Sequence, residues 1–118
     1  MLMIEDDAAT RQLVRINLEA VGIDLLEAQD GSAGIELARE ARPDLILLDV
    51  GLPVLDGWQI ARELKDDPWT YEIPLVFVSA RTHPNERERG LRIGAIDYIP
   101  KPFDPIELVD RVRSFIEG

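Results

Sequence analysis

The residues of this sequence best suited to chemistry each follow a short apolar run. They are three consecutive acids, a single aspartate, a serine and a lysine: Glu5-Asp6-Asp7, Asp49, Ser79 and Lys101. Carboxylates that converge repel one another unless a cation lies between them, and a set of oxygen ligands without histidine or cysteine favours a hard cation. The set therefore predicts a Mg²⁺ site, with Ser79 and Lys101 able to bind an anion such as phosphate.

Asp49 is the most informative of these residues. It ends the apolar run 45–48, and Gly51 follows two residues later, where the lack of side-chain bulk would let a backbone carbonyl reach a metal. An aspartate can itself attack phosphorus and carry an acyl phosphate. Lys101 is one of only two lysines among 13 basic residues, which makes its place after an apolar run notable. The residues thus indicate a site where Mg²⁺ and a phosphoryl group meet a carboxylate.

The elements that must position these residues alternate between short apolar runs and longer amphipathic ones. Strands are predicted at 2–4, 23–28, 45–48, 75–78 and 95–99. Helices are predicted at 8–21, 33–41, 57–66, 84–93 and 105–116. Strand–helix alternation of this kind predicts an α/β fold with a parallel five-stranded sheet and helices on both faces. Unbroken apolar runs such as 45–48 and 75–78 are typical of strands buried on both sides.

Local signals give finer predictions. The first helix is expected to bury a face made of Ala9, Leu13, Ile16 and Ala20 and to stop at Gly22. Ser32 is a possible N-cap of the second helix, and Asp56 a cap of the third.

Ligands of open α/β sheets bind beyond the carboxyl ends of the strands. If the strand order is the flavodoxin-like 2-1-3-4-5, the first and third strands are neighbours, so Glu5, Asp6 and Asp49 converge. Ser79 would then lie beside them, and Lys101 farther along the edge. The second strand ends at 29–30, where we predict no residue of the site.

Length and composition narrow the class of protein. The chain has 118 residues, 46% of them hydrophobic, no cysteine and a net charge of −10. We expect a single domain over 1–118, repelled by nucleic-acid phosphates and therefore not binding nucleic acid directly. No segment approaches about 20 apolar residues and no basic-apolar leader is present, so we expect a cytoplasmic protein without membrane contact.

Five short motifs occur in order, each at a predicted strand end. They are Ile4-Glu5-Asp6-Asp7, Asp49-x-x-Leu52-Pro53-x-x-Asp56-Gly57, Val78-Ser79-Ala80, Gly94-Ala95-x-Asp97-Tyr98 and Lys101-Pro102-Phe103. With these motifs the chain resembles a response-regulator receiver domain, the phospho-acceptor module of two-component signalling. The resemblance covers essentially the whole chain and departs mildly at Leu52, where the family often has Met.

The resemblance implies a role for each residue of the predicted site. Asp49 would be the phosphorylated aspartate. Asp6 would touch Mg²⁺ directly and Glu5 through water, while Gly51 would lend its backbone carbonyl to the metal.

The resemblance also implies how the domain switches. Ser79 and Lys101 would each bind a phosphoryl oxygen, Tyr98 would swing inward as Ser79 moves, and the Lys101–Pro102 peptide would be cis. The donor would be a sensor histidine kinase or a phosphotransfer protein. The fourth helix, fifth strand and fifth helix would form the face that contacts a downstream effector, an output domain or a second copy in a homodimer.

Other functions compatible with this topology fit the residues less well. A flavin carrier needs an anion-binding loop after the first strand, where Glu5-Asp6-Asp7 would repel phosphate. A phosphohydrolase with an aspartyl intermediate carries the motif Asp-x-Asp after a strand. Here the second acid is missing, because position 51 is Gly. We therefore expect a regulatory domain, not an enzyme, that catalyses only its own phosphorylation and slow dephosphorylation. An inactive receiver used only for protein contacts stays an alternative that the intact set argues against. Since no output domain follows residue 118, the chain is either a free-standing receiver or a piece of a longer protein.

Overall fold

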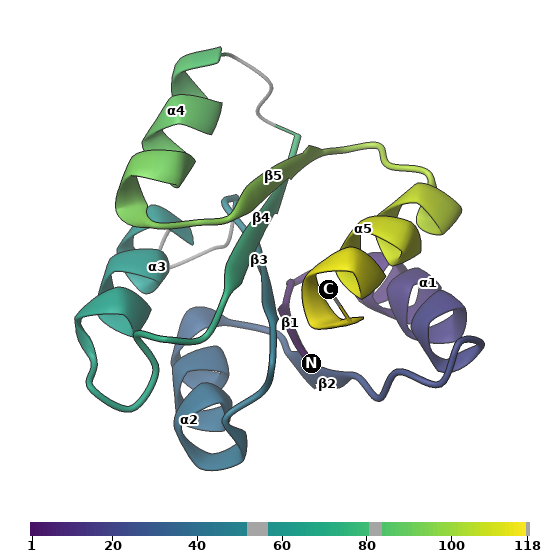
Figure 1. Cartoon of the computed structure of the whole chain (residues 1–118), viewed down its shortest axis with the longest axis horizontal. Coiled ribbons are helices and arrows are strands. Elements are labelled where there is room, and N and C mark those ends of the chain that lie inside the picture. Colours follow the sequence, from purple (N-terminus) through teal and green to yellow (C-terminus); the bar gives the residue numbers. More distant parts are fainter. Residues whose placement is uncertain (52–56, 81–83, 118) are drawn as a thin grey trace.

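The computed structural model describes residues 1–51, 57–80 and 84–117. Its strands form one parallel sheet in the order β2-β1-β3-β4-β5, and a helix follows each strand along the chain (Figure 1). This confirms the predicted α/β fold and strand order. The elements are β1 (Leu2–Ile4), α1 (Ala8–Glu19), β2 (Leu26–Ala28), α2 (Gly31–Ala41), β3 (Ile46–Asp49), α3 (Gly57–Asp66), β4 (Leu75–Ser79), α4 (Pro84–Ile93), β5 (Asp97–Pro100) and α5 (Pro105–Glu117).

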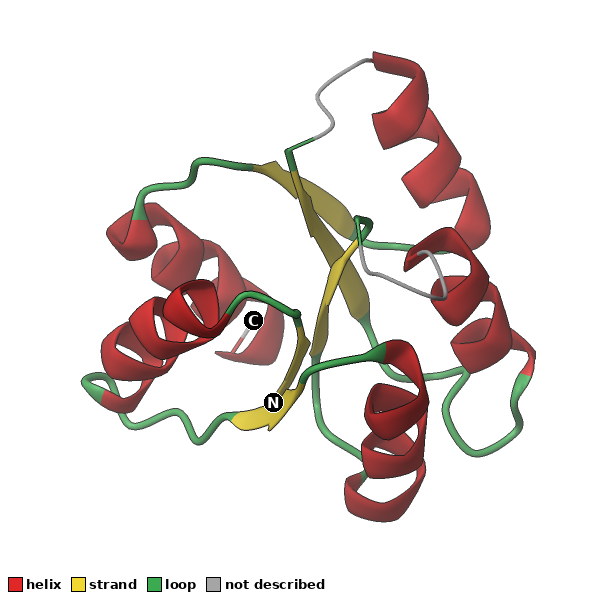
Figure 2. Ribbon diagram, turned by 180° about the vertical axis from the view of Figure 1, so that it is seen from behind, coloured by secondary structure: helices red, strands yellow, loops and turns green. Residues whose placement is uncertain are grey.

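The helices cover both faces of the sheet. α1 and α5 lie side by side on one face, and α2, α3 and α4 lie on the other (Figures 1 and 2). Successive residues of a strand point to opposite faces, so Leu2 and Ile4 pack with α2 and α3 while Met3 packs with α1 and α5. Two hydrophobic cores thus enclose β1, β3 and β4, which explains why their sequences are unbroken apolar runs.

Helix α1 buries a different face from the predicted one. Val14 and Leu18 are its buried residues, whereas Leu13 and Ile16 are 42% and 58% exposed. The prediction that Leu13, Ile16 and their neighbours Ala9 and Ala20 face the core was wrong. The helix carries two apolar stripes with helical spacing, and the spacing alone does not tell which stripe faces the sheet.

The corrected face of α1 predicts a clear difference in stability between two substitutions. Leu18→Ala is expected to lower the free energy of unfolding by about 2–5 kcal/mol, because it leaves a cavity between α1 and the sheet. Ile16→Ala, on the exposed stripe, should change it by less than about 0.5 kcal/mol. Urea unfolding of both variants measures this, and equal losses would contradict the assignment.

Capping groups set the starts of two helices. Asp7 caps α1 by accepting from Thr10 N at 3.2 Å. Asp30, and not the predicted Ser32, caps α2 by accepting from Ala33 N at 2.9 Å, so α2 begins at Gly31. The predicted cap of α3, Asp56, and the family position Leu52 lie outside the described residues.

The outer strands are shorter or shifted relative to prediction. β2 begins at Leu26 instead of residue 23, because β1 offers only Leu2–Ile4 for pairing. β5 runs from Asp97 to Pro100, because its register places these residues opposite residues 76–79 of β4. α1 ends at Glu19, earlier than the predicted residue 21, and Gly22 follows in the next turn with φ of +81°. Among the described residues, no helix combines the length and the apolar composition needed to cross a membrane.

Candidate functional site

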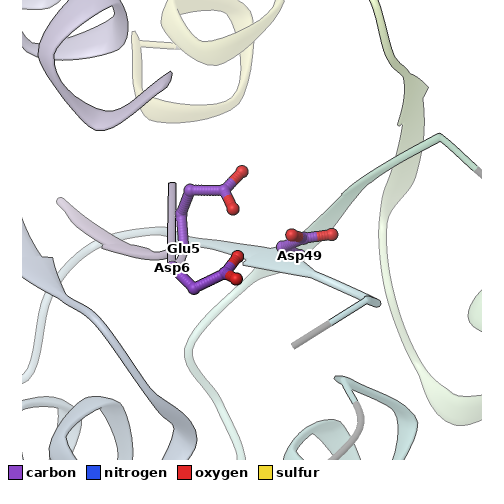
Figure 3. A group of neighbouring side chains, drawn as sticks. All are labelled: Glu5, Asp6 and Asp49. Atoms are coloured by element: carbon purple, nitrogen blue, oxygen red, sulfur yellow. The ribbon is translucent and has the colours of Figure 1, made fainter. Parts of the chain in front are cut away.

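Three predicted acids meet at the carboxyl edge of the sheet. Glu5 and Asp6 directly follow β1, and Asp49 is the last residue of β3. The parallel register pairs Ile4 with Leu48, so the residues that come next project from neighbouring strands. One carboxylate oxygen from each acid lies within 4.8 Å of the other two (Figure 3). Strand order and register are therefore what bring these carboxylates together.

Glu5 is the buried member of the group, with its side chain only 1% exposed. One of its oxygens pairs with Lys101 Nζ, and the other accepts from Asp7 N at 3.3 Å. Burial, followed by the neighbouring Asp49, raises the pKa of Glu5 to about 7, and the Lys101 ammonium offsets this only in part. The pocket therefore disfavours the charge that Glu5 carries in water.

Asp49 is largely buried, with its side chain 10% exposed. Its Oδ1 accepts from Gly51 N at 3.0 Å, and its Oδ2 lies 3.3 Å from Lys101 Nζ. Each oxygen of the carboxylate thus has a donor of its own. These two contacts fix the orientation of the carboxylate.

Lys101 approaches two of the acids at once. Burial would lower the pKa of Lys101, but Glu5 and Asp49 together raise it above its ordinary value. The cluster thus holds three carboxylates, and the Lys101 ammonium contacts two of them. Their negative charge exceeds what Lys101 can neutralise, and the all-oxygen donor set fits a hard divalent cation such as Mg²⁺.

The three consecutive acids differ in what they contact. Glu5 is buried, and Asp6 is exposed but belongs to the group of carboxylates that could hold a metal ion. Asp7 caps α1 instead. Thr10 donates to Asp7 from both its backbone and its hydroxyl, and the hydroxyl bond lowers the pKa of Asp7. Two of the three acids therefore belong to the site, and the third serves the helix.

Ser79 lies on β4, the strand next to Asp49, and Tyr98 lies on β5, one strand farther along the sheet. Ser79 is buried at the end of β4, and its carbonyl accepts from Lys101 N at 2.7 Å. Tyr98 is buried on β5, and its ring lies 6.1 Å from Phe77. The Lys101–Pro102 peptide is cis, as the resemblance implies. The backbones that carry Ser79 and Lys101 are thus joined directly at the sheet edge.

Gly57 supports the site in a way that sequence analysis missed. A Cβ at this position would lie 2.5 Å from the carbonyl oxygen of Asp49 and 2.5 Å from the Cα of Val50. Gly57 N also donates to Val50 O at 2.9 Å. The sequence places Gly57 only in the Asp56-Gly57 part of a motif and gives no sign of this contact. The role of Gly57 is to let α3 begin directly against the backbone of Asp49.

In the absence of Mg²⁺, Glu5 is expected to make stability depend on pH. Its pKa rises from 4.5 to about 7 on folding, so its stabilising effect is complete below about pH 4.5 and is lost as the pH rises through about 7. Glu5→Gln cannot ionise and should exceed the wild type in stability by about 3 kcal/mol near pH 8.

Urea unfolding with a chelator at several pH values checks this, with the exposed Glu36→Gln as control. If Glu5→Gln and wild type showed the same dependence on pH, the assigned protonation of Glu5 would be wrong. Adding Mg²⁺ near pH 8 should make the wild type more stable than Glu5→Gln, because only the wild type offers the cation a third carboxylate.

Comparison with known proteins shows the family. A model of the response regulator receiver domain matches residues 1–113. The chain is 43% identical over 114 residues to the phosphate regulon regulator PhoB of Escherichia coli, covering 97% of this chain and 50% of that protein. It is 41% identical over 116 residues to the DNA-binding regulator RpaA of Synechocystis, covering 98% and 48%. The chain thus spans about half the length of these relatives.

Solved structures agree with this family. Chemotaxis protein CheY4 of Vibrio cholerae superposes with a TM-score of 0.90 at 27% identity, over 97% of this chain and 95% of that one. The receiver domain of sensor histidine kinase PA1611 of Pseudomonas aeruginosa, which has a magnesium ion coordinated in its active-site cleft, gives 0.88 at 30% identity, over 99% and 96%. This chain belongs to the response regulator receiver domain family of two-component signalling.

Proposed function

We propose that residues 1–118 form a single receiver domain in which Asp49 accepts a phosphoryl group from a phosphohistidine. The donor is a sensor histidine kinase or a phosphotransfer protein. The observation that carries the proposal is the meeting of Glu5, Asp6 and Asp49 within 4.8 Å, with Lys101 against two of them. A charged, oriented carboxylate beside a cation site is what phosphoryl transfer requires.

Mg²⁺ would be held by Glu5, Asp6 and Asp49 together with the backbone carbonyl of Gly51. When bound, it would offset negative charge on the transferring phosphoryl oxygens. The fit rests on the oxygen donors and on the excess of carboxylates over ammonium groups in the cluster. The magnesium ion in the PA1611 receiver domain, 30% identical to this chain, supports the same assignment.

The transfer itself needs positioning more than acid–base chemistry. An oxygen of Asp49 forms a bond to phosphorus as the bond from phosphorus to the histidine nitrogen breaks, and the imidazole leaves with its electron pair. Gly51 N and Lys101 Nζ hold the Asp49 carboxylate during attack. Lys101 and the Ser79 hydroxyl then bind oxygens of the new acyl phosphate.

Phosphorylation would switch the face formed by α4, β5 and α5. The new group adds roughly −1.5 to −2 charges if it behaves like other protein phosphates. Ser79 and Lys101 are joined by a backbone hydrogen bond of 2.7 Å, so attraction of both toward the phosphate moves the ends of β4 and β5 together. Tyr98, on β5, reports that movement to the face. A downstream effector, an output domain or a second copy of the chain would read it.

The domain acts as a regulatory component and turns over no separate substrate. Aspartyl phosphohydrolases carry a second acid two residues after the nucleophile, and this chain has Gly51 there. Only slow self-dephosphorylation is therefore expected. The acidic composition, with a net charge of −10, disfavours direct binding of nucleic acid by this domain. The relative RpaA is named as DNA-binding, and this chain matches 48% of it.

The test is chemical. The purified chain is incubated with acetyl phosphate and Mg²⁺, and its intact mass is measured. We expect one phosphoryl group per chain, removal of that group by hydroxylamine, and no reaction when a chelator replaces Mg²⁺. A chain that stays unmodified, or that is modified equally with chelator, would overturn the proposal.

A further inference from the structure

Arg11 links the end of β1 to strand β2. Its Nη1 donates to the backbone carbonyl of Glu5 at 2.7 Å, and its Nε lies 3.4 Å from a carboxylate oxygen of Glu27. The side chains of Arg11 and Glu27 are 13% and 22% exposed. Glu27 also pairs with Arg15, one helical turn farther along α1. Arg11 is therefore held from one side while it holds Glu5 on the other.

Both backbone polar groups of Glu5 depend on β2. Its N–H donates to Ala28 O at 3.0 Å, and its carbonyl is bound by Arg11, which Glu27 of β2 orients. The sequence predicts no residue of the site at 29–30, where the second strand ends. That prediction considered only residues at the strand's carboxyl end, whereas Glu27 acts from within the strand through a side chain of α1.

The carbonyl that Arg11 binds belongs to the peptide joining Glu5 to Asp6. A peptide group is planar, so fixing its oxygen also fixes the amide nitrogen of Asp6 and the direction in which Asp6 leaves the strand. Two of the three carboxylates in the cluster are thus attached to one anchored peptide. Metal affinity depends on such outer contacts because ligands have to be held in position before the ion binds.

We propose that Arg11, oriented by Glu27, is a positioning residue for the cation site formed by Glu5, Asp6 and Asp49. The inference rests on the proposed function, since it concerns the same site. Arginine suits this role because its planar guanidinium donates in two directions at once, here to a carbonyl and to a carboxylate. A lysine carries the same charge but presents it at a single point.

The experiment measures Mg²⁺ affinity of the purified chain by isothermal titration calorimetry. Arg11→Ala should weaken binding about tenfold. Arg11→Lys keeps the charge but should still weaken binding by about threefold or more. Glu27→Gln should show a smaller loss, and its combination with Arg11→Ala should be no worse than Arg11→Ala alone. Arg39→Ala, which removes an arginine paired with Asp67, is the matched control and should bind as wild type does.

A second readout needs no metal. The amide group of Asp6 belongs to the same peptide as the carbonyl that Arg11 binds. In the Mg²⁺-free chain, its NMR resonance should therefore shift in Arg11→Ala and Arg11→Lys but not in Arg39→Ala. If Arg11→Ala fails to fold, Arg11→Lys and Glu27→Gln carry both measurements.

The outcomes separate the two proposals. Failure of the wild type to bind Mg²⁺ would overturn the proposed function and this inference with it. Wild-type binding that Arg11→Ala and Arg11→Lys retain within twofold, or an Asp6 amide that neither substitution moves, would overturn the role of Arg11 alone.

Discussion

Asp49→Asn is expected to abolish phosphorylation of the chain by acetyl phosphate and Mg²⁺. Asparagine has the shape of aspartate but lacks the anionic oxygen that attacks phosphorus. Its amide oxygen still accepts from Gly51 N, the partner of Asp49 Oδ1 at 3.0 Å, so the local backbone should persist. Labelling should fall from about one phosphoryl group per chain to background, as measured by intact mass.

The matched control is Asp66→Asn, an exposed aspartate at the end of α3. It should be labelled as fully as the wild type. Stoichiometric labelling of Asp49→Asn would exclude Asp49 as the acceptor, and its peptide map would then identify the true one. Loss of labelling in both variants would point to a general effect of charge and would contradict a specific role of Asp49.

Lys101→Met is expected to separate cation binding from switching. The ammonium lies 3.3 Å from Asp49 Oδ2 and also pairs with Glu5, so it repels any second cation there. Its removal should tighten Mg²⁺ binding by about threefold to tenfold. This is less than the full Coulomb repulsion between the ammonium and Mg²⁺, because solvent screens part of that repulsion. Phosphorylation of this variant should nevertheless leave the amide resonances of Ser79 and Tyr98 unshifted. The reason is that the Lys101 ammonium, which would draw the ends of β4 and β5 toward the phosphate, is gone.

Lys65→Met provides the control, because Lys65 is the other lysine of the sequence. Its ammonium donates to the carbonyls of Tyr71 and Ile73, at 3.2 and 3.0 Å. We expect this variant to bind Mg²⁺ and to respond to phosphorylation as the wild type does. Weaker Mg²⁺ binding by Lys101→Met, measured by calorimetry, would show that Lys101 supports the cation site instead of competing with it.

The central strands could be predicted from sequence because burial on both faces leaves a simple signal. The unbroken apolar runs at β3 and β4 give their positions and also the polar residues that follow, Asp49 and Ser79. The peripheral elements carry weaker signals. The extent of β2 is set by the three residues that β1 offers for pairing, and the buried stripe of α1 is set by packing against α5 and the sheet. Neither constraint is local in sequence.

The composition of the acidic cluster could be predicted, but its electrostatics could not. The convergence of Glu5, Asp6 and Asp49 follows from strand order and from the rule that strand ends share an edge. The raised pKa of Glu5 depends on its burial, and the contact of Lys101 with both Glu5 and Asp49 depends on a loop path. The contact between Arg11 and Glu5 involves α1, β1 and β2 together, so no local sequence motif predicts it.

The close approach of Gly57 determines which parts of the domain can move. There is no space for a side chain between α3 and the Asp49–Val50 peptide, so Asp49 and the start of this helix are in direct backbone contact. Interior packing transmits displacement without absorbing it. Under the proposed function, we therefore expect that a phosphoryl group on Asp49 is not accommodated by withdrawal of the Asp49 backbone toward α3. Under that function, we expect the rearrangement to occur across the site instead, at the ends of β4 and β5, in the direction of α4 and α5.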